Sequence, residues 1–444
     1  MARGRLGASL ERNAIALMAA SAITALVGLA FWAVATRLPA EEVGRASAVL
    51  STATMFSVLA SQNVGLVVSR FLPGAGRRSQ RLVLGGYGVA IVVAVVLSVG
   101  FALFLASDTL FRSGSEKLYF PVVVLVLAVF TLQDWVLTGL RMSIWVPLEQ
   151  LLFAAVKLGL LVMLISVLPD DAILLAWTVP AAVAVVVVSS LIMVRVLPRR
   201  PEPLAGVVEL PPRKALTKIF FAEYATGAMT VIVPMLLPLI VVAHLGTAAN
   251  AYYALPWMLS EAFNMLLWNI GSSYMVEVSH DSTRAAALLM RTAKLSGLVM
   301  LAGVPFLLFA APWLLTLLGG AYAAEGAGVM RLLACAVPFL IITNLYLSTA
   351  RVRQQMGRVV AVQLGATVVT LGLAFMLVDP LGIDGVALAY LIAEVLSALV
   401  VLGPLIQVFR GKASVAPPDP ETVVLPVVRY ADPETIVLPV IRRY

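Results

Sequence analysis

The chain has 444 residues, of which 61% are hydrophobic and 12% are charged, and its formal net charge is +8. A typical soluble domain is about half apolar and about a quarter charged, so a soluble protein of this composition would expose patches large enough to aggregate. The basic residues are scattered between apolar runs, which argues against a nucleic-acid-binding protein and for an integral membrane protein that contacts lipid.

A membrane-spanning helix needs about 20 apolar residues. By that length the sequence predicts about twelve spans, in chain order at 13–36, 46–69, 82–106, 119–140, 147–168, 172–194, 217–243, 251–276, 295–318, 328–350, 359–378 and 385–409. A proline-rich, charged loop at 198–214 divides them into six and six. We therefore expect an all-α integral membrane protein with a six-helix lobe at 1–197, a cytoplasmic linker at 198–214, a second six-helix lobe at 215–410 and a tail at 411–444.

The distribution of basic residues predicts the orientation, because lysine and arginine concentrate in cytoplasmic loops. With twelve spans and the N-terminus inside, nearly all basic residues fall on the cytoplasmic side. The exceptions are Lys157 within a span, and Arg37, Arg45, Arg112, Lys117 and Arg331 on the outer side. An odd number of helices in either half would break this alternation, so we expect both termini in the cytoplasm.

The two halves of the chain resemble each other weakly at their first loops. Residues 37–44 precede the second span, and residues 244–251 precede the eighth. Each of these spans carries polar residues late in its length: Gln62 and Asn63 in one, Asn264 and Asn269 in the other. Duplicated halves with a binding site between them are a recurrent design of transporters.

The tail contains one segment twice, at 419–430 and 432–444, and both copies begin Asp-Pro-Glu-Thr. Its prolines exclude a long helix, so we expect a disordered cytoplasmic tail. Thr422 and Thr435 each have a leucine three positions later, a pattern similar to substrates of actinobacterial Ser/Thr kinases and, once phosphorylated, to ligands of FHA domains. The alternative is an unmodified, solvated tail; the duplication favours a binding role, because two copies raise avidity.

Three stretches resemble a known family. Residues 37–73 contain a Leu-Pro, a later glycine and an arginine closing the second span, and residues 318–322 read Leu-Gly-Gly-Ala-Tyr. Between 355 and 389 the chain has Gln-Met-Gly-Arg and then Pro-Leu-Gly-Ile-Asp-Gly-Val-Ala-Leu-Ala. These stretches resemble the polysaccharide-biosynthesis flippases of the multidrug/oligosaccharidyl-lipid/polysaccharide exporter superfamily.

The resemblance covers nearly the whole chain and includes no catalytic signature. It implies two six-helix lobes around a central cavity, transport by alternating access, and a place in the bacterial plasma membrane. The implied cargo is a polyprenyl-pyrophosphate-linked oligosaccharide, flipped from the cytoplasmic to the outer leaflet for cell-surface polysaccharide synthesis.

Charged residues deep inside the spans are the candidate transport residues, because a charge at the bilayer centre costs about 2.5–3.5 kcal/mol and must face a cavity or a partner. They are Asp134, Lys157, Glu223, Glu261 and Glu394. Asp134 and Lys157 lie on consecutive spans. Either they form an ion pair within the N-terminal lobe, or Lys157 faces the cavity and, with Arg70, meets an anionic headgroup.

Glu223 and Glu261 lie on consecutive spans of the C-terminal lobe. Glu261, Asn264 and Trp268 have i, i+3, i+7 spacing and share one helix face, which could bind a sugar through hydrogen bonds and stacking. A carboxylate shielded from water could instead take H⁺ or Na⁺, and hydrogen-bonded structural carboxylates are the remaining interpretation. Glu394 is a structural or coupling candidate. The excess of acids over bases departs from the cationic cavity expected for a pyrophosphate cargo.

Several other functions remain open. One is a cation-coupled drug or small-molecule exporter of the same superfamily. Another is a membrane glycosyltransferase or polymerase, although the predicted outer loops are short and their acids form no motif. A third is a scaffold that recruits partners through a phosphorylated tail. The sequence has no Cys/His cluster with metal-ligand spacing. We expect a transporter and not an enzyme.

Overall fold

The computed structural model describes residues 23–24, 26–104, 110–111, 114–142, 145–199, 213–280 and 284–410. Every regular element within these ranges is a helix, as the composition predicts. Helices satisfy all their backbone hydrogen bonds internally, which is the condition for crossing a bilayer. Most of the predicted linker and the whole tail, with Thr422 and Thr435, lie outside the described residues.

The N-terminal lobe begins with a short apolar helix at Leu26–Ala35, followed by longer helices that match the predicted spans. These are α2 (Ala40–Phe71), α3 (Ser79–Phe104), α4 (Gly114–Gly139), α5 (Trp145–Leu164) and α6 (Ala172–Leu191). Helix α2 packs on α3 and α4, and α6 packs on α4 and α5. We use the term N-terminal lobe for these helices.

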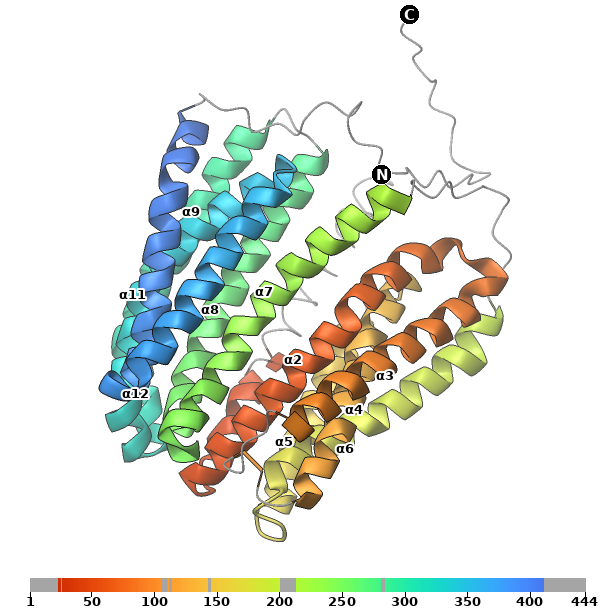
Figure 1. Cartoon of the computed structure of the whole chain (residues 1–444), viewed down its shortest axis with the longest axis horizontal. Coiled ribbons are helices and arrows are strands. Elements are labelled where there is room, and N and C mark those ends of the chain that lie inside the picture. The colour runs from red at the N-terminus through yellow and green to blue at the C-terminus, as the bar shows by residue number, and fades with distance from the viewer. Residues whose placement is uncertain are drawn as a thin grey trace, which may run out of the picture.

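The C-terminal lobe contains the remaining helices (Figure 1). These are α7 (Arg213–Leu245), α8 (Thr247–His280), α9 (Ala285–Pro305), α10 (Ala311–Leu318), α11 (Gly320–Val352) and α12 (Met356–Phe409). A π-helical turn at Phe306–Ala310 joins α9 to α10, so the two together cover the predicted ninth span. The turn follows Pro305, which cannot donate a backbone hydrogen bond to the preceding turn.

Helix α12 covers the last two predicted spans. It is broken at Gly382, where φ is 62° and ψ is −145°, a left-handed conformation that favours glycine. Residues eight apart in a straight helix are separated by about 12 Å, yet a Cβ on Gly385 would collide with the carbonyl oxygen of Leu377. The chain therefore folds back at Gly382, and α12 provides two antiparallel spans.

Among the described residues, 9 helices are long and apolar enough to cross a membrane, with the folded α12 counted once. Helix α8 is not among them although it has 34 residues. It carries Glu261, Asn264 and Asn269, so its polarity marks it as a helix that faces something other than lipid.

The two lobes meet along α2, which packs on both α7 and α8. Figure 1 shows α2 and α7 side by side between the lobes. The approach is closest where α2 and α8 begin: a Cβ on Gly44 would collide with the backbone of Thr247 and Ala251. These are the two segments whose sequences resemble each other, so the related halves touch at related positions.

Hydrogen bonds accompany this close approach. The side-chain nitrogen of the buried Asn250 donates to the carbonyl oxygen of Gly44 at 2.7 Å and to the hydroxyl of Ser47 at 2.8 Å. Because all three residues are at the first turns of α2 and α8, these bonds join the lobes at one end of the molecule. We call this contact the α2–α8 seam.

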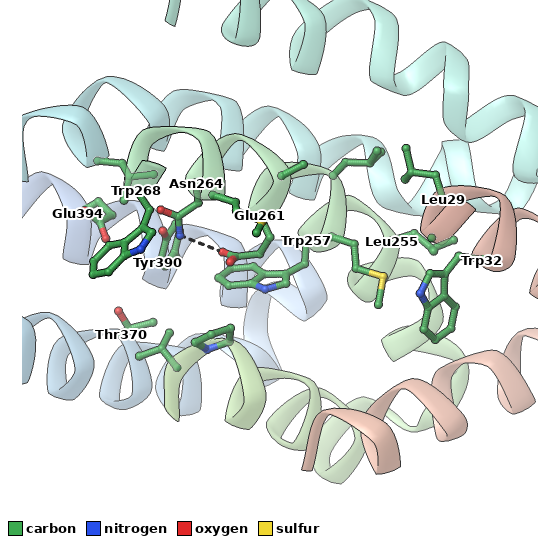
Figure 2. Close-up of a pocket in the computed structure, with 18 of the residues that line it drawn as sticks. Leu29, Trp32, Leu255, Trp257, Glu261, Asn264, Trp268, Thr370, Tyr390 and Glu394 are labelled. Carbon is green, nitrogen blue, oxygen red and sulfur yellow. Dashed lines mark hydrogen bonds between the residues drawn. The ribbon is translucent and has the colours of Figure 1, made fainter. Parts of the chain in front are cut away.

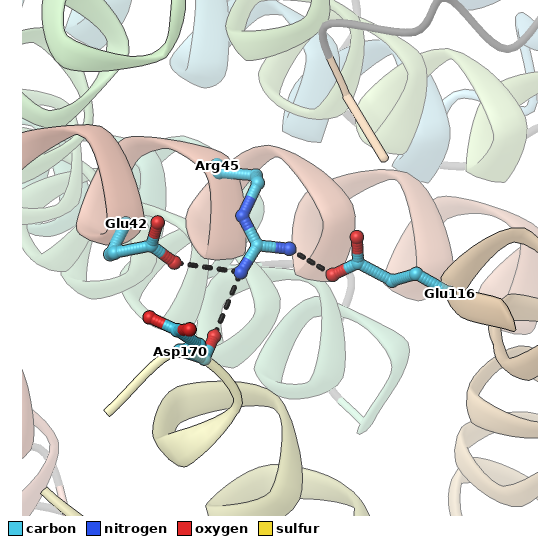
Figure 3. Close-up of polar contacts among 4 residues, drawn as sticks. All are labelled: Glu42, Arg45, Glu116 and Asp170. Carbon is cyan, nitrogen blue, oxygen red and sulfur yellow. Dashed lines mark hydrogen bonds and ion pairs between the residues drawn. The ribbon is translucent and has the colours of Figure 1, made fainter. Parts of the chain in front are cut away.

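A buried arginine fixes α2 within its own lobe beside the seam. Arg45 forms ion pairs with Glu42, at 2.7 Å, and with Glu116 on α4 (Figure 3). It also donates to the carbonyl oxygen of Asp170 at 2.8 Å, just before α6. Arg45 is one of the few basic residues that the charge distribution predicts on the outer side, and these pairs compensate its buried charge.

Candidate functional site

A cavity of about 1000 Å³ lies between the lobes. Helices α7, α8, α11 and α12 line it from the C-terminal lobe, and the short first helix, Lys157 of α5 and Trp177 of α6 line it from the other. Most of the wall is apolar, with polar groups confined to a few positions. Such a cavity suits an amphiphile better than a fully polar solute.

The polar end of the cavity is formed by the α8 face that the spacing predicts. Glu261, Asn264 and Trp268 all line the cavity, and the Asn264 side-chain nitrogen donates to Glu261 Oε1 at 3.3 Å. Figure 2 shows these residues beside Tyr390 and Glu394 of α12. A carboxylate, an amide and an indole on one face can bind a hydroxylated ring through hydrogen bonds and stacking.

Glu394 brings a second carboxylate to this end. Its side chain is almost fully buried, and its Oε2 has no hydrogen-bond partner among the described residues. Glu261 and Glu394 are close enough to repel each other, and no described lysine or arginine forms an ion pair with either. Two neighbouring carboxylates without a base, one buried and one half-buried, favour uptake of a cation or a proton.

Lys157 lies in an aromatic cage at the other end of the cavity. Its Nζ is 3.8 Å from the ring centre of Trp177, 4.8 Å from that of Phe31 and 5.2 Å from that of Phe153. Phe31 contacts Trp32, which Figure 2 shows at the end opposite Glu394. Cation–π contacts hold the ammonium without neutralising it, so Lys157 remains the one basic side chain among the described residues that line the cavity.

The ion pair between Asp134 and Lys157 does not form. Asp134 accepts a hydrogen bond from Gln150 at 3.1 Å and is not among the residues that line the cavity. The reason is axial separation: Asp134 lies near the end of α4 beside the first turns of α5, whereas Lys157 lies about two turns further along α5. Asp134 therefore does not line this cavity, and a part for it in transport stays a prediction.

The remaining predicted residues divide as follows. Glu261, Asn264, Trp268, Lys157 and Glu394 line the cavity. Arg70 belongs to α2 and Glu223 to α7, but their side chains lie outside the described part of the structure.

Some cavity residues give little signal in the sequence. Thr343, Gln363 and Thr370 line the cavity, but single polar residues of this kind are common in apolar helices and predict no site. Tyr390 precedes Glu394 by four positions and so shares its helix face, which is a signal that spacing could have detected. Trp177 is placed only by the packing of α6 on α5.

The sequence matches no protein-family model, and no curated protein is similar to it in sequence. Solved structures do match in fold. An inward-facing multidrug resistance MATE family transporter of the MOP superfamily superposes with a TM-score of 0.68 at 15% identity, covering 88% of this chain and 96% of that one. An outward-facing MATE family transporter of the same superfamily gives 0.59 at 14% identity, covering 90% and 96%.

The lipid II flippase MurJ, in an inward closed conformation, gives a TM-score of 0.66 at 12% identity, covering 88% of this chain and 87% of that one. The chain therefore has the 12-helix fold of MOP-superfamily transporters and is a multi-pass membrane protein. This confirms the predicted fold class. Within that superfamily fold, the resemblance to the polysaccharide-biosynthesis flippases stays a prediction.

Proposed function

We propose that this protein flips a polyprenyl-pyrophosphate-linked oligosaccharide from the cytoplasmic to the outer leaflet by alternating access, for cell-surface polysaccharide synthesis. The observation that carries the proposal is the division of the cavity: an apolar wall, one uncompensated lysine at one end, and a carboxylate–amide–indole face at the other. Each part matches one chemical part of such a cargo.

The sugar part fits the α8 face. Sugar hydroxyls can donate to Glu261 and accept from Asn264, and a pyranose ring can stack on Trp268. The guanidinium of Arg351 lies 4.9 Å from the ring centre of Trp268 on one side, and this contact holds the indole in place.

The anionic part fits Lys157. A cation–π contact is worth about 2 kcal/mol or more when desolvated, and a hydrogen bond to a charged group contributes about 1.5–3 kcal/mol. Because the three rings do not neutralise the ammonium, a phosphate oxygen can accept a hydrogen bond from it in addition to the cation–π contacts. The apolar wall, which includes Leu29 and Leu255 (Figure 2), then accommodates the first isoprenoid units.

Alternating access is supported by the way the lobes meet. They touch along α2 and are joined by hydrogen bonds at the α2–α8 seam, and the fold superposes better on the inward-facing than on the outward-facing transporter. We propose that the seam closes the outer end in this state and parts when the carrier turns outward.

A second function rests on a separate observation. The paired carboxylates of Glu261 and Glu394 have no basic partner among the described residues, and multidrug transporters share this fold. Exchange of H⁺ or Na⁺ for a small organic cation would use the same pair. The same coupling would also drive the flippase.

Inverted membrane vesicles from cells that overproduce the chain test both functions. A fluorescent polyprenyl-pyrophosphate-linked oligosaccharide should become inaccessible to an impermeant quencher, and the rate should drop for the Glu261→Gln variant. Movement of a small cationic dye instead, driven by an ion gradient, would replace the first function by the second. Formation of a new glycosidic product would contradict both.

A further inference from the structure

Two arginines continue the cavity wall beyond its inner end, the end that the charge distribution predicts on the cytoplasmic side. On α11 the residues that line the cavity end at Leu347. Arg351 follows Leu347 by four positions, so it lies on the same face one turn further along. On α12 the lining residues begin at Val362, and Arg358 precedes Val362 by four positions. We call Arg351 and Arg358 the arginine pair.

The guanidinium of Arg351 lies against the wall of the cavity. Its central carbon is 4.9 Å from the ring centre of Trp268, the last cavity-lining residue of α8, which Figure 2 shows near Glu394. A basic residue at the end of a span ordinarily extends away from the hydrocarbon, toward the headgroups. Because Arg351 instead reaches a residue of the cavity wall, the concentration of arginine in cytoplasmic loops does not by itself account for its direction.

Close packing of α8 on α11 brings these two residues together. A Cβ on Gly271 would lie 2.5 Å from the hydroxyl oxygen of Ser348, so the two helices nearly touch there. Trp268 precedes Gly271 by three positions, and Arg351 follows Ser348 by three. Side chains lean toward the N-terminus of their helix, which carries the guanidinium of Arg351 back toward the indole.

The arginine pair offers the donors that a phosphate needs. Stacking on the indole uses the flat face of a guanidinium, whereas its five N–H donors lie in its plane and match phosphate oxygens two at a time. Arg358 is exposed, and its Nη1 donates to Gln355 Oε1 at 3.1 Å. Since α11 ends at Val352 and α12 begins at Met356, a short turn holds both positive charges at one end of the cavity.

We propose that the arginine pair binds the phosphates of the lipid-linked cargo where it enters, before the anion reaches Lys157. This site rests on the proposed function and adds an entry step to it. A pyrophosphate linkage carries a negative charge on each phosphate, which two guanidinium groups match and one ammonium does not. The pair and Lys157 lie at opposite ends of the cavity, as is required for a phosphate that begins in one leaflet and ends in the other.

The test measures the binding of radiolabelled farnesyl pyrophosphate to the full chain in nanodiscs of phosphatidylcholine, a lipid without net charge. Farnesol, which has the same isoprenoid chain and no phosphate, reports binding by the chain alone. Arg351→Gln with Arg358→Gln should weaken the affinity for farnesyl pyrophosphate at least about tenfold, because a hydrogen bond to a charged group is worth about that factor or more. The affinity for farnesol should not change.

Arg353→Gln is the matched control. Arg353 carries the same charge in the same turn, but its spacing places it on neither lining face, so both affinities should be retained. If the double variant does not fold, Arg358→Gln alone, at an exposed position, must show the weakening. An unchanged affinity without the pair, or equal weakening by Arg353→Gln, overturns the proposal.

Phosphatidylglycerol added to the nanodiscs separates the cargo from ordinary anionic lipid. Farnesyl pyrophosphate should remain bound in its presence, and displacement by phosphatidylglycerol would show a site for bulk lipid and overturn the proposal. Flipping in vesicles is measured separately. A wild-type chain that binds the probe through the arginine pair but does not flip the oligosaccharide contradicts the proposed function alone. Flipping at the same rate with and without the pair contradicts this site alone.

Discussion

At the residue scale, the position of Lys157 shows what a sequence can and cannot specify. A lysine in the middle of an apolar helix predicts a functional or paired charge, and the structure leaves it facing the cavity. Phe153 lies four residues before it on α5 and so shares its helix face, whereas Phe31 and Trp177 come from two other helices that only tertiary packing brings alongside. The sequence therefore predicts the importance of the residue but not its surroundings.

Replacing Lys157 tests the anion site directly. Lys157→Met keeps the length and apolar character of the side chain and removes the charge. Transport of a pyrophosphate-linked cargo should fall at least about tenfold, because a hydrogen bond to a charged group contributes about 1.5–3 kcal/mol. A vesicle flipping assay measures it. Lys157→Arg should retain part of the activity, and equal rates for wild type and Lys157→Met would rule out the anion site.

The carboxylate of Glu394, whose Oε2 has no hydrogen-bond partner among the described residues, gives a second residue-scale prediction. Glu394→Gln removes the charge and keeps the shape, so the protein should fold while the dependence of transport on an imposed proton or sodium gradient is lost. Transport rates with and without the gradient measure this. Thr316→Ala on α10, which removes an exposed hydroxyl, is the control. An unchanged gradient dependence in Glu394→Gln would assign the coupling elsewhere.

At the element scale, the extent of the spans follows well from apolar run length, whereas their contacts do not. Gly382 lies in the polar break between the last two predicted spans, and its positive φ confirms a chain reversal there. Gly44, by contrast, is one glycine among 31, and nothing local distinguishes it. A glycine is required at this position only because the backbone of α8 lies against it across the lobe boundary.

Adding a single methyl group at Gly44 should disrupt the α2–α8 seam. Gly44→Ala places a Cβ against the Thr247 carbonyl oxygen, so α2 and α8 should separate at this end. In a chain with Cys335→Ala and Ser47→Cys, an impermeant thiol reagent should label position 47 faster in the Gly44→Ala variant. Gly88→Ala on α3, where a Cβ meets no atom within 4 Å, should not change the labelling rate. Equal labelling in both variants would contradict the seam.

The ion pairs of Arg45 should contribute strongly to the stability of the N-terminal lobe. Its side chain is 5% exposed, and its carboxylate partners are each 10% exposed. Removing one member of a buried ion pair costs about 3–5 kcal/mol, so Arg45→Ala should lower the unfolding temperature of the solubilised protein markedly. Arg37→Ala, an exposed arginine before α2, should change the stability by less than about 0.5 kcal/mol. Similar unfolding curves for both variants would refute this role of Arg45.

At the scale of the whole molecule, the sequence predicts the architecture more completely than the site. The helical spans follow from hydropathy, and the charged loop near residue 200 predicts a division into two lobes. The α8 face of the cavity follows from the spacing of Glu261, Asn264 and Trp268. The burial of the Glu149 carboxylate does not follow from the sequence, because Glu149 lies near the start of its span, where a charge is commonly solvated, and its burial depends on the packing of α4 and α6 around α5.

Joining the lobes covalently tests whether they move. In a chain with Cys335→Ala, the pair Ser47→Cys and Asn250→Cys replaces a 2.8 Å hydrogen bond across the seam. Oxidation should stop transport, and reduction should restore it, because the seam must part in every cycle. The same oxidation of the Ser47→Cys variant alone should have no effect. Transport that continues with the seam cross-linked would exclude a moving-lobe mechanism.

The placement of the lysine on one lobe and the carboxylates on the other has a consequence for selection by size. A molecule that reaches both ends ties the lobes together, so its two chemical parts are pulled by different bodies when the lobes move. A shorter molecule with only the anion, or only the sugar, contacts one lobe and does not link it to the other. The protein would thereby select cargo by length: it would transport molecules whose headgroup is fully assembled and would not transport their shorter precursors.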